Sequence, residues 1–224
     1  MSYKIGLIGL AGSGKDTVAV ILQEALKERG QVFEIDRYAG LLKEAARQVF
    51  GENFDDRNVK EEMVFVTPQL WDKLWDACDY TAITLYPKSR REYDKDSVYY
   101  DLFMDMVDKA FGNLTWISPR LFQQLLGTEV GRAIDPDIWV NYLRDQDRNL
   151  IIPDVRFGNE DVDFNILITR HPVPKGKLHA SEVYAAELQL SDNPYDYVDY
   201  VIHNDGSIED LKRKVQQLVN KIKI

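Results

Sequence analysis

The clearest chemistry in the chain lies in a glycine-rich turn near its start. Residues 3–17 read Tyr-Lys-Ile-Gly-Leu-Ile-Gly-Leu-Ala-Gly-Ser-Gly-Lys-Asp-Thr, and Gly9, Gly14 and Lys15 occupy the fixed positions of the pattern G-x-x-x-x-G-K. Glycines let such a loop turn tightly and point its backbone N–H groups at phosphate oxygens. The lysine adds a positive charge for the β- and γ-phosphates of a nucleoside triphosphate. The turn therefore predicts a triphosphate-binding loop.

The residues on both sides of this loop support the prediction. An apolar segment at 5–8 indicates a short buried strand, and the apolar residues of 18–26 have the spacing of a helix with one buried face. The N-terminus of that helix adds a partial positive charge at the same place. The alternative is an accidental glycine-rich turn in a dinucleotide-binding fold. Asp16 stands where Ser or Thr is usual, and Thr17 follows it.

A second candidate segment follows an apolar strand expected at 150–153. Asp154 and Arg156 come directly after it. A carboxylate at the end of a strand, beside a phosphate loop, can hold the hydration shell of magnesium or a substrate hydroxyl. The ordinary alternative is an aspartate that caps a turn.

A third candidate segment, 124–132, combines glycines with polar side chains. Gly127 and Gly131 are expected to let the chain bend, which leaves Thr128 and Arg132 near a pocket and outside regular structure. Arg132 can hold a second phosphate group through its planar guanidinium. A surface arginine after a helix end is the alternative.

Three other residues have both a functional and a structural interpretation. Arg170 opens a basic loop at about 170–180 that can close over a triphosphate as a lid, or can simply be solvated. Trp139 lies just inside an expected helix, where it can stack on a base or pack in the core. Lys43 follows a strand expected at 32–35 and, taken alone, is typical of a solvated helix surface.

Strands alternate with helices along much of the chain, which predicts a parallel sheet covered on both faces. Further strands are expected at 166–169 and 200–202, and Ser207 with Asp210 resembles the capping box of a C-terminal helix. Between about 52 and 114 the apolar spacing becomes helical, so we expect a helical insertion there. The charged segment 87–96 within it is expected to be a surface loop.

Composition limits the classes of function. A chain of 224 residues with 45% hydrophobic residues fits one α/β domain with an elaboration. The single cysteine excludes an internal disulfide and suits a reducing cytosol. A net charge of −9 disfavours non-specific binding to nucleic acid. No apolar run is long enough for a membrane span.

Taken together, these segments resemble the bacteriophage deoxynucleoside monophosphate kinases of the P-loop nucleotide kinase superfamily. The resemblance follows one order along nearly the whole chain, although 52–114 carries almost none of it. The matching pieces are Gly-Ser-Gly-Lys-Asp-Thr at 12–17, Tyr-Ala-x-x-Leu-Lys at 38–43, Gln-x-x-Gly-Thr-Glu-x-Gly-Arg at 124–132, Asp-Pro-Asp-Ile-Trp at 135–139, Asp-Val-Arg-Phe-x-Asn-Glu at 154–160, His-x-Ser-Glu at 179–182 and Ile-x-Asn-x-Gly at 202–206.

The resemblance implies an α/β fold of the three-layer nucleoside-monophosphate-kinase type, with a parallel sheet, helices on both faces and a helical insertion. It implies one P-loop kinase domain over 1–224, a substrate-side subdomain at about 52–114 and a lid-like loop at about 170–180. The implied reaction is the ATP- and Mg²⁺-dependent phosphorylation of deoxynucleoside 5′-monophosphates to diphosphates.

The resemblance also assigns residues to parts of the site. ATP would be bound by Gly12, Ser13, Gly14, Lys15, Asp16 and Thr17. The monophosphate would be bound by Lys43, Arg120, Gln124, Gly127, Thr128, Arg132, Trp139, Asp154, Arg156 and Glu160. The expected catalytic cations are Lys15, Arg132, Arg156 and Arg170. Magnesium would be held, directly or through water, by Asp16, Thr17 or Asp154.

The chain departs from the family pattern at 37–40, where Arg-Tyr-Ala-Gly stands in place of the usual Ser-Phe-Ala-Asp, so substrate preference stays open. Two alternatives remain at this point. Dephospho-coenzyme A kinases share the loop type and the 202–206 tail, but they lack the 124–132 pattern. A nucleotide-binding regulator without transfer activity is the other. We expect the partners to be small nucleotide substrates, and the family resemblance is compatible with a homodimer. We also expect the protein to act in the cytoplasm, which is the host cytoplasm if a phage encodes the chain.

Overall fold

The computed structural model describes residues 2–87, 95–155, 162–171 and 180–222. They form two compact units: the first comprises 1–38 and 143–224, and the second comprises 39–142. The helical insertion expected at about 52–114 lies within the second unit, whose bounds are wider.

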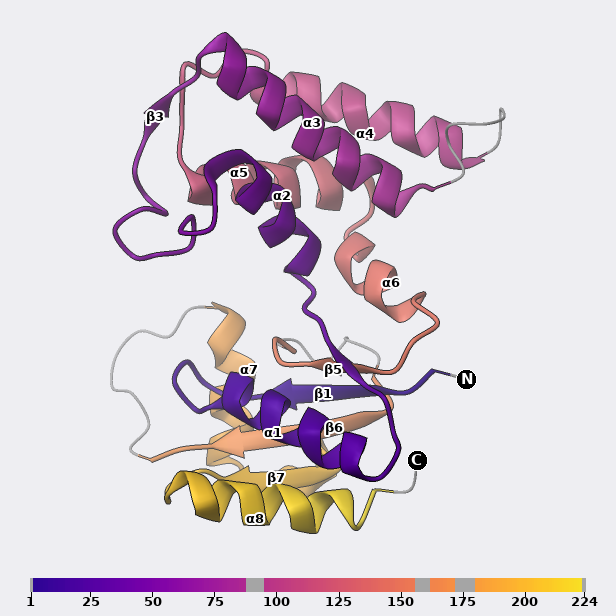
Figure 1. Cartoon of the computed structure of the whole chain (residues 1–224), viewed down its shortest axis with the longest axis vertical. Coiled ribbons are helices and arrows are strands. Elements are labelled where there is room, and N and C mark those ends of the chain that lie inside the picture. The colour runs from indigo at the N-terminus through magenta and orange to yellow at the C-terminus, as the bar shows by residue number, and fades with distance from the viewer. Residues whose placement is uncertain (1, 88–94, 156–161, 172–179, 223–224) are drawn as a thin grey trace. The chain divides into compact units, whose positions relative to one another are not determined.

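A five-stranded parallel sheet forms the centre of the first unit (Figure 1). Its order is β2-β5-β1-β6-β7, and every neighbouring pair is parallel. The strands are β1 (Lys4–Ile8), β2 (Glu34–Ile35), β5 (Leu150–Ile152), β6 (Phe164–Thr169) and β7 (Tyr200–His203). Because all strands run the same way, the loops that follow them gather at one edge of the sheet. The predicted parallel sheet is confirmed.

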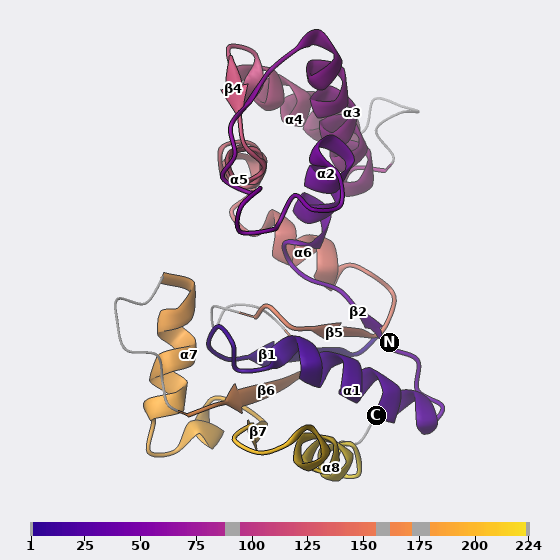
Figure 2. The ribbon, with the colours of Figure 1, turned by 60° about the vertical axis from the view of Figure 1, so that its left-hand side comes forward.

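Helices cover both faces of this sheet, so the predicted α/β fold with helices on both faces is confirmed (Figure 2). Side chains alternate along a strand, and Ile5 and Leu7 share a buried cluster with α1 (Lys15–Glu28) and α8 (Ile208–Val219). The other helix, α7 (Ala180–Leu190), packs against β6 and is followed by a short 3₁₀ turn, η2 (Pro194–Asp196).

The predicted start of α8 is confirmed in detail. The side chain of Ser207 accepts a hydrogen bond from the N–H of Asp210 at 3.2 Å, and the Asp210 carboxylate accepts one from the N–H of Ser207 at 3.2 Å. This reciprocal pair satisfies two N–H groups that a helix start otherwise leaves unpaired. Leu211, Val215 and Leu218 then form the buried stripe of the helix.

The second unit is mainly helical, around a core that includes Leu74, Phe103, Phe111 and Phe122. Its helices are α2 (Gly40–Phe50), α3 (Pro68–Leu85), α4 (Lys95–Phe111), α5 (Pro119–Gln124) and α6 (Ile138–Arg144), of which α6 runs across the boundary between the units. A two-stranded antiparallel ribbon joins β3 (Val64–Phe65) to β4 (Trp116–Ile117). None of the helices in the described ranges is both long and apolar enough to cross a bilayer.

The expectation of irregular structure in 124–132 is wrong. The chain continues from α5 as a π-helix, η1 (Leu125–Arg132). Gly127 and Gly131 serve close packing here, because a Cβ atom on them would lie 3.0 Å from Leu42 Cδ1 and 2.5 Å from Trp139 Cζ2 respectively. Most of the charged segment 87–96 and of the lid-like loop 170–180 lies outside the described residues.

Candidate active site

The glycine-rich loop after β1 forms a cradle that glycine alone fits. Gly12 and Gly14 have φ angles of +75° and +96°, a region that side chains with a Cβ avoid. A Cβ on Gly9 would lie 2.6 Å from both the Ile168 carbonyl oxygen and Ser13 Oγ. A larger residue at position 9 would therefore clash unless the backbone or Ser13 moved. With glycine at this position, backbone atoms line the loop.

Polar groups within this cradle have unused hydrogen-bonding capacity. Ser13 is 2% exposed, and its Oγ has no hydrogen-bond partner among the described residues. The first turn of α1 has Gly14 at its N-cap and no side-chain cap, so N–H groups at the helix start are left for another acceptor. A buried hydroxyl beside an uncapped helix N-terminus fits a phosphate group, which supplies several acceptor oxygens.

Residues from the ends of β6 and β7 contact the loop. Asn204 Nδ2 donates to the Ser13 carbonyl oxygen at 2.8 Å, and Arg170 Nη1 donates to the Gly12 carbonyl oxygen at 3.4 Å. The N–H of Ala11 donates to Glu182 Oε1 of α7 at 3.1 Å. The structure therefore places Arg170 beside the loop and adds Asn204 and Glu182 as groups that fix the loop. The lid role of 170–180 stays a prediction.

Lys15 is held on the loop itself. Its Nζ donates to the carbonyl oxygens of Gly9 at 2.7 Å and Leu10 at 2.9 Å. The ammonium group therefore lies on backbone carbonyls at the beginning of the loop. That it turns to the phosphates of a bound triphosphate, as the motif predicts, stays a prediction.

Asp16 and Thr17 both lie exposed in the first turn of α1. Asp16 Oδ1 forms an ion pair with Arg37 Nη2, and the two side chains are 76% and 37% exposed. Arg37 is one of the residues at which the chain departs from the pattern of the family it resembles. The pair gives that arginine a partner at the phosphate loop.

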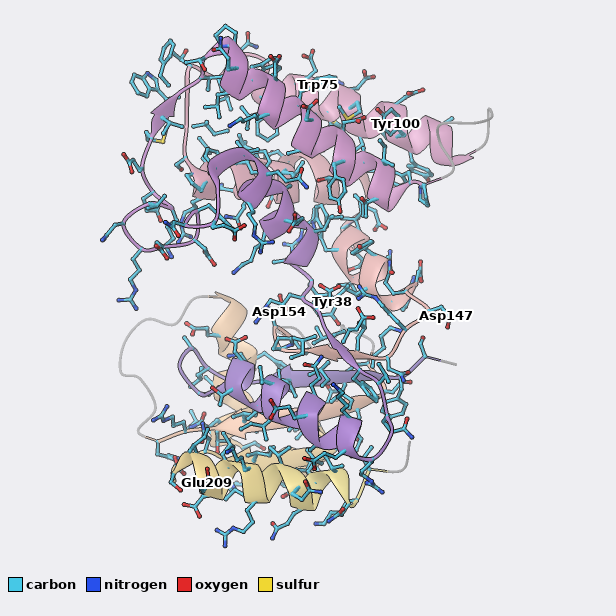
Figure 3. All side chains as sticks on the ribbon, in the orientation of Figure 1. Tyr38, Trp75, Tyr100, Asp147, Asp154 and Glu209 are labelled. Atoms are coloured by element: carbon cyan, nitrogen blue, oxygen red, sulfur yellow. The ribbon has the colours of Figure 1, made fainter. Side chains whose placement is uncertain are left out.

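Asp154, at the end of β5, accepts a hydrogen bond from the backbone N–H of Tyr38 at 3.0 Å, and Figure 3 shows the two residues side by side. The carboxylate thus ties the end of β5 to the segment after β2. Arg156 and Glu160, which follow Asp154 in the predicted site, lie outside the described residues. No group of three or more His, Cys, Asp or Glu side chains suited to a metal occurs in the parts of the chain that are described.

The second unit carries a polar stripe along the continuous helix α5–η1. Arg120, Gln124, Thr128 and Arg132 are exposed, whereas Phe122, Leu126 and Val130 are buried. Each set repeats every four residues, so exposure and burial alternate along opposite sides of the helix. Four predicted substrate residues therefore share one exposed face.

Two predicted substrate cations already pair with carboxylates of the segment that follows α2. Lys43 Nζ lies 2.6 Å from Asp55 Oδ2, and Arg120 Nε forms an ion pair with Glu61. The backbone N–H of Arg120 also donates to the Lys60 carbonyl oxygen at 2.9 Å. Sequence spacing gave no signal for these pairs, because the partners are brought together only by the fold.

Trp139 is buried, with 4% of its surface exposed. Its Nε1 donates to the Gly127 carbonyl oxygen at 3.0 Å, and its ring covers Gly131. Of the two interpretations of this residue, the packing favours the core role. Gly127 contributes to this packing, because its carbonyl oxygen accepts the hydrogen bond from the indole.

Asp205 and Cys78 are among the titratable groups outside the loop whose pKa values are shifted. The backbone N–H of His171 donates to Asp205 Oδ1 at 2.7 Å, and this bond lowers the pKa of the Asp205 carboxyl. Burial raises the pKa of the Cys78 thiol, so Cys78 is a structural residue of the second unit's core.

Comparison with known proteins adds a relative of similar length. No family model matches the chain. The deoxynucleoside-5′-monophosphate kinase of Escherichia phage T5 is 31% identical to it over 189 residues, a match that covers 71% of this chain and 70% of the relative. Identity at this level over most of both chains agrees with the phosphate loop and the parallel sheet described above. The chain belongs to the deoxynucleoside monophosphate kinase family.

Proposed function

We propose that this protein transfers the γ-phosphoryl group of ATP to deoxynucleoside 5′-monophosphates and so forms the diphosphates. The observation that carries the proposal is the loop cradle, in which a buried Ser13 hydroxyl and an uncapped start of α1 lack acceptors within the described chain. A triphosphate supplies such acceptors. The name of the phage T5 relative supports the choice of acceptor.

The donor would be held by residues 12–17, with Lys15 placing its charge beside the β- and γ-phosphates. Thr17, Asp16 and Asp154 have the oxygen chemistry that Mg²⁺ prefers, and they would hold it directly or through water. Bound magnesium would neutralise charge on the phosphate oxygens. Arg170, which contacts Gly12, would act as a further catalytic cation and compensate the charge that develops during the transfer.

The acceptor would be bound by the exposed stripe Arg120, Gln124, Thr128 and Arg132, together with Lys43. An oxygen of the monophosphate forms a bond to the γ-phosphorus while the bond to the β–γ bridging oxygen breaks, and ADP leaves. The attacking oxygen is already ionised at neutral pH, so alignment and charge compensation matter more than a general base. Arg132 and Arg156 are the proposed acceptor-side catalytic cations.

The assay is a panel of deoxynucleoside monophosphates with ATP and Mg²⁺, read out as ADP and as diphosphate formed. We expect monophosphate-dependent ADP release with at least one base. The Lys15→Ala variant should lose about a thousandfold in rate, the scale of one transition-state cation in phosphoryl transfer. Lys27→Ala, in the last turn of the same helix, is the matched control and should keep the wild-type rate.

Three outcomes would contradict the proposal in distinct ways. ATP binding without monophosphate-dependent ADP release would favour the nucleotide-binding regulator. Transfer to dephospho-coenzyme A alone would favour the other kinase class. A rate for Lys15→Ala near that of the wild type would show that the phosphate loop does not take part in the transfer as proposed. The homodimer and the host-cytoplasmic location stay predictions.

A further inference from the structure

A groove lies between α3 and α4 of the second unit. None of its lining residues belongs to the polar stripe of α5–η1. The groove has a volume of about 590 Å³ and is lined by Trp71, Asp72, Trp75, Asp76 and Asp108. We name it the Trp–Asp groove. Trp71 with Trp75, and Asp72 with Asp76, are each four residues apart, so α3 presents two indoles and two carboxylates on adjoining parts of one surface.

The two indoles of the Trp–Asp groove are only partly used by the core. Trp71 packs at the margin of the unit's hydrophobic cluster. Trp75, which is labelled in Figure 3, is 38% exposed. The ring centroids lie 6.3 Å apart at an interplanar angle of 40°. Indole rings carry a large apolar surface, so a pair that opens into a groove is a surface suited to contact with a partner.

The carboxylates of the Trp–Asp groove have no opposite charge bound to them in the described parts of the chain: Asp72, Asp76 and Asp108 form no ion pair there. Asp72 and Asp76 are like charges at helical spacing, which destabilises a helix. Asp108 lies in the last turn of α4, where the helix dipole disfavours a negative charge.

The excess of negative charge extends along both α3 and α4. They carry aspartate at 72, 76, 79, 96, 101, 105 and 108, against lysine at 73, 95 and 109. Aspartates therefore outnumber lysines by seven to three on these two helices. Their arrangement around two indoles is complementary to a cation that also has an extended flat surface.

We propose that the Trp–Asp groove is a docking site for an arginine-bearing basic segment of a protein partner. A guanidinium stacks on an indole face and donates paired hydrogen bonds to a carboxylate, so one arginine uses both kinds of group that line the groove. A lysine ammonium provides the charge without the stacking plane, and a metal ion would leave the indoles unused. The acidic surface repels nucleic acid.

The test measures binding of the peptide acetyl-Gly-Arg-Gly-Arg-Gly-amide to the full-length protein by calorimetry at low salt. We expect saturable 1:1 binding that weakens as salt is raised, because charge pairs at a surface are screened. The peptide with citrulline in place of both arginines keeps the shape and loses the charge, and it should bind at least tenfold more weakly.

Variants locate the binding. Trp75→Ala should weaken it about two- to fivefold, the loss expected for a cation–π contact at a partly exposed indole. Asp76→Asn combined with Asp108→Asn should weaken it by a similar factor. The matched controls are Trp116→Ala, an exposed tryptophan on β4, and Asp105→Asn, an exposed aspartate of α4 that does not line the groove; both should bind as the wild type does.

The proposal is overturned if the wild type binds the arginine peptide no better than the citrulline peptide, or if the control variants weaken binding as much as the groove variants. Sedimentation velocity of the same proteins covers another occupant. A wild-type dimer that Trp75→Ala dissociates would assign the groove to a second copy of the chain and overturn the proposal. Kinase activity plays no part in these readouts.

Discussion

At the scale of single residues, the most informative contact is the ion pair between Asp16 and Arg37. Asp16 replaces the usual Ser or Thr of the phosphate loop, and Arg37 replaces the usual serine of the family pattern. The structure brings these two departures together at the start of α1. An acidic residue beside a triphosphate would repel it, and the arginine compensates for that charge.

Arg37→Ala should therefore weaken ATP binding. Both side chains are more than a third exposed, so the pair is worth at most about 1 kcal/mol and the expected rise in the ATP dissociation constant is about two- to fivefold. Adding Asp16→Asn to Arg37→Ala should restore part of the affinity for ATP in the absence of Mg²⁺, since Asp16 is also one of the residues proposed to hold the metal. Fluorescence titration of the two single variants and the double variant measures the coupling; additive effects would show that the pair does not act as a unit.

Asp205 provides a test of pH dependence. The hydrogen bond from the His171 N–H lowers its pKa in the folded state. Its contribution to stability is then fully present above the unfolded-state value of about 3.9 and is lost as the pH falls through the lower folded-state value. Wild type and Asp205→Asn should thus differ in unfolding free energy at pH 7, and the difference should shrink below about pH 4.

Urea unfolding at a series of pH values measures this difference. Asp192→Asn, an exposed position, is the control and should differ little from wild type throughout. A difference for Asp205→Asn that stays constant down to pH 3 would contradict the assignment of the hydrogen bond.

At the scale of elements, the continuous helix α5–η1 determines which residues face solvent. Its exposed stripe and its buried stripe both repeat every four residues through the π-helical turn. A π-helical segment inside a helix commonly accompanies a functional site. Close packing at Gly127 and Gly131 allows α2 and α6 to approach it.

Gly131→Ala should destabilise the protein more than Gly127→Ala. A methyl group at 131 would lie 2.5 Å from the Trp139 ring, which is held by its bond to Gly127, whereas one at 127 would meet a flexible end of Leu42 at 3.0 Å. Overpacking of this kind costs about 1–3 kcal/mol. Thermal unfolding compares the two variants; equal midpoints would show that the indole can move aside.

The segment after α2 supplies another prediction. Asp55 and Glu61 pair with Lys43 and Arg120, the cations proposed to bind the acceptor phosphate. A bound phosphate must replace these exposed pairs. Asp55→Asn and Glu61→Gln should each lower the KM for the monophosphate by up to about fivefold, since each exposed pair is worth at most about 1 kcal/mol. Arg120→Ala should raise it. A rise in KM for the two carboxylate variants would show that the carboxylates themselves serve the substrate.

At the scale of the whole molecule, elements with strong local signals were predictable. The strand, glycine loop and helix at 4–28, the parallel sheet and the capping box at Ser207 follow from spacing and turn chemistry that act over a few residues. The β3–β4 ribbon was not predicted, because two residues per strand give no alternation to detect.

The rest of the site depends on contacts between distant parts of the chain. The stripe on α5–η1 was misjudged because glycines, which usually signal a bend, here serve close packing. The pairs of Arg37 with Asp16 and of Lys43 with Asp55 join separate elements, and no local pattern reports them. The burial of Trp139 likewise follows from the fold of the second unit.

The central claim is that the protein moves a phosphoryl group from ATP to a deoxynucleoside monophosphate. The direct measurement is incubation of the purified protein with ATP labelled on the γ-phosphate, Mg²⁺ and each deoxynucleoside monophosphate, followed by separation of the products. We predict that the label appears in the deoxynucleoside diphosphate in amounts equal to the ADP formed, and that Lys15→Ala slows this transfer about a thousandfold. Label that appears only as inorganic phosphate, at a rate independent of the monophosphate, would contradict the claim.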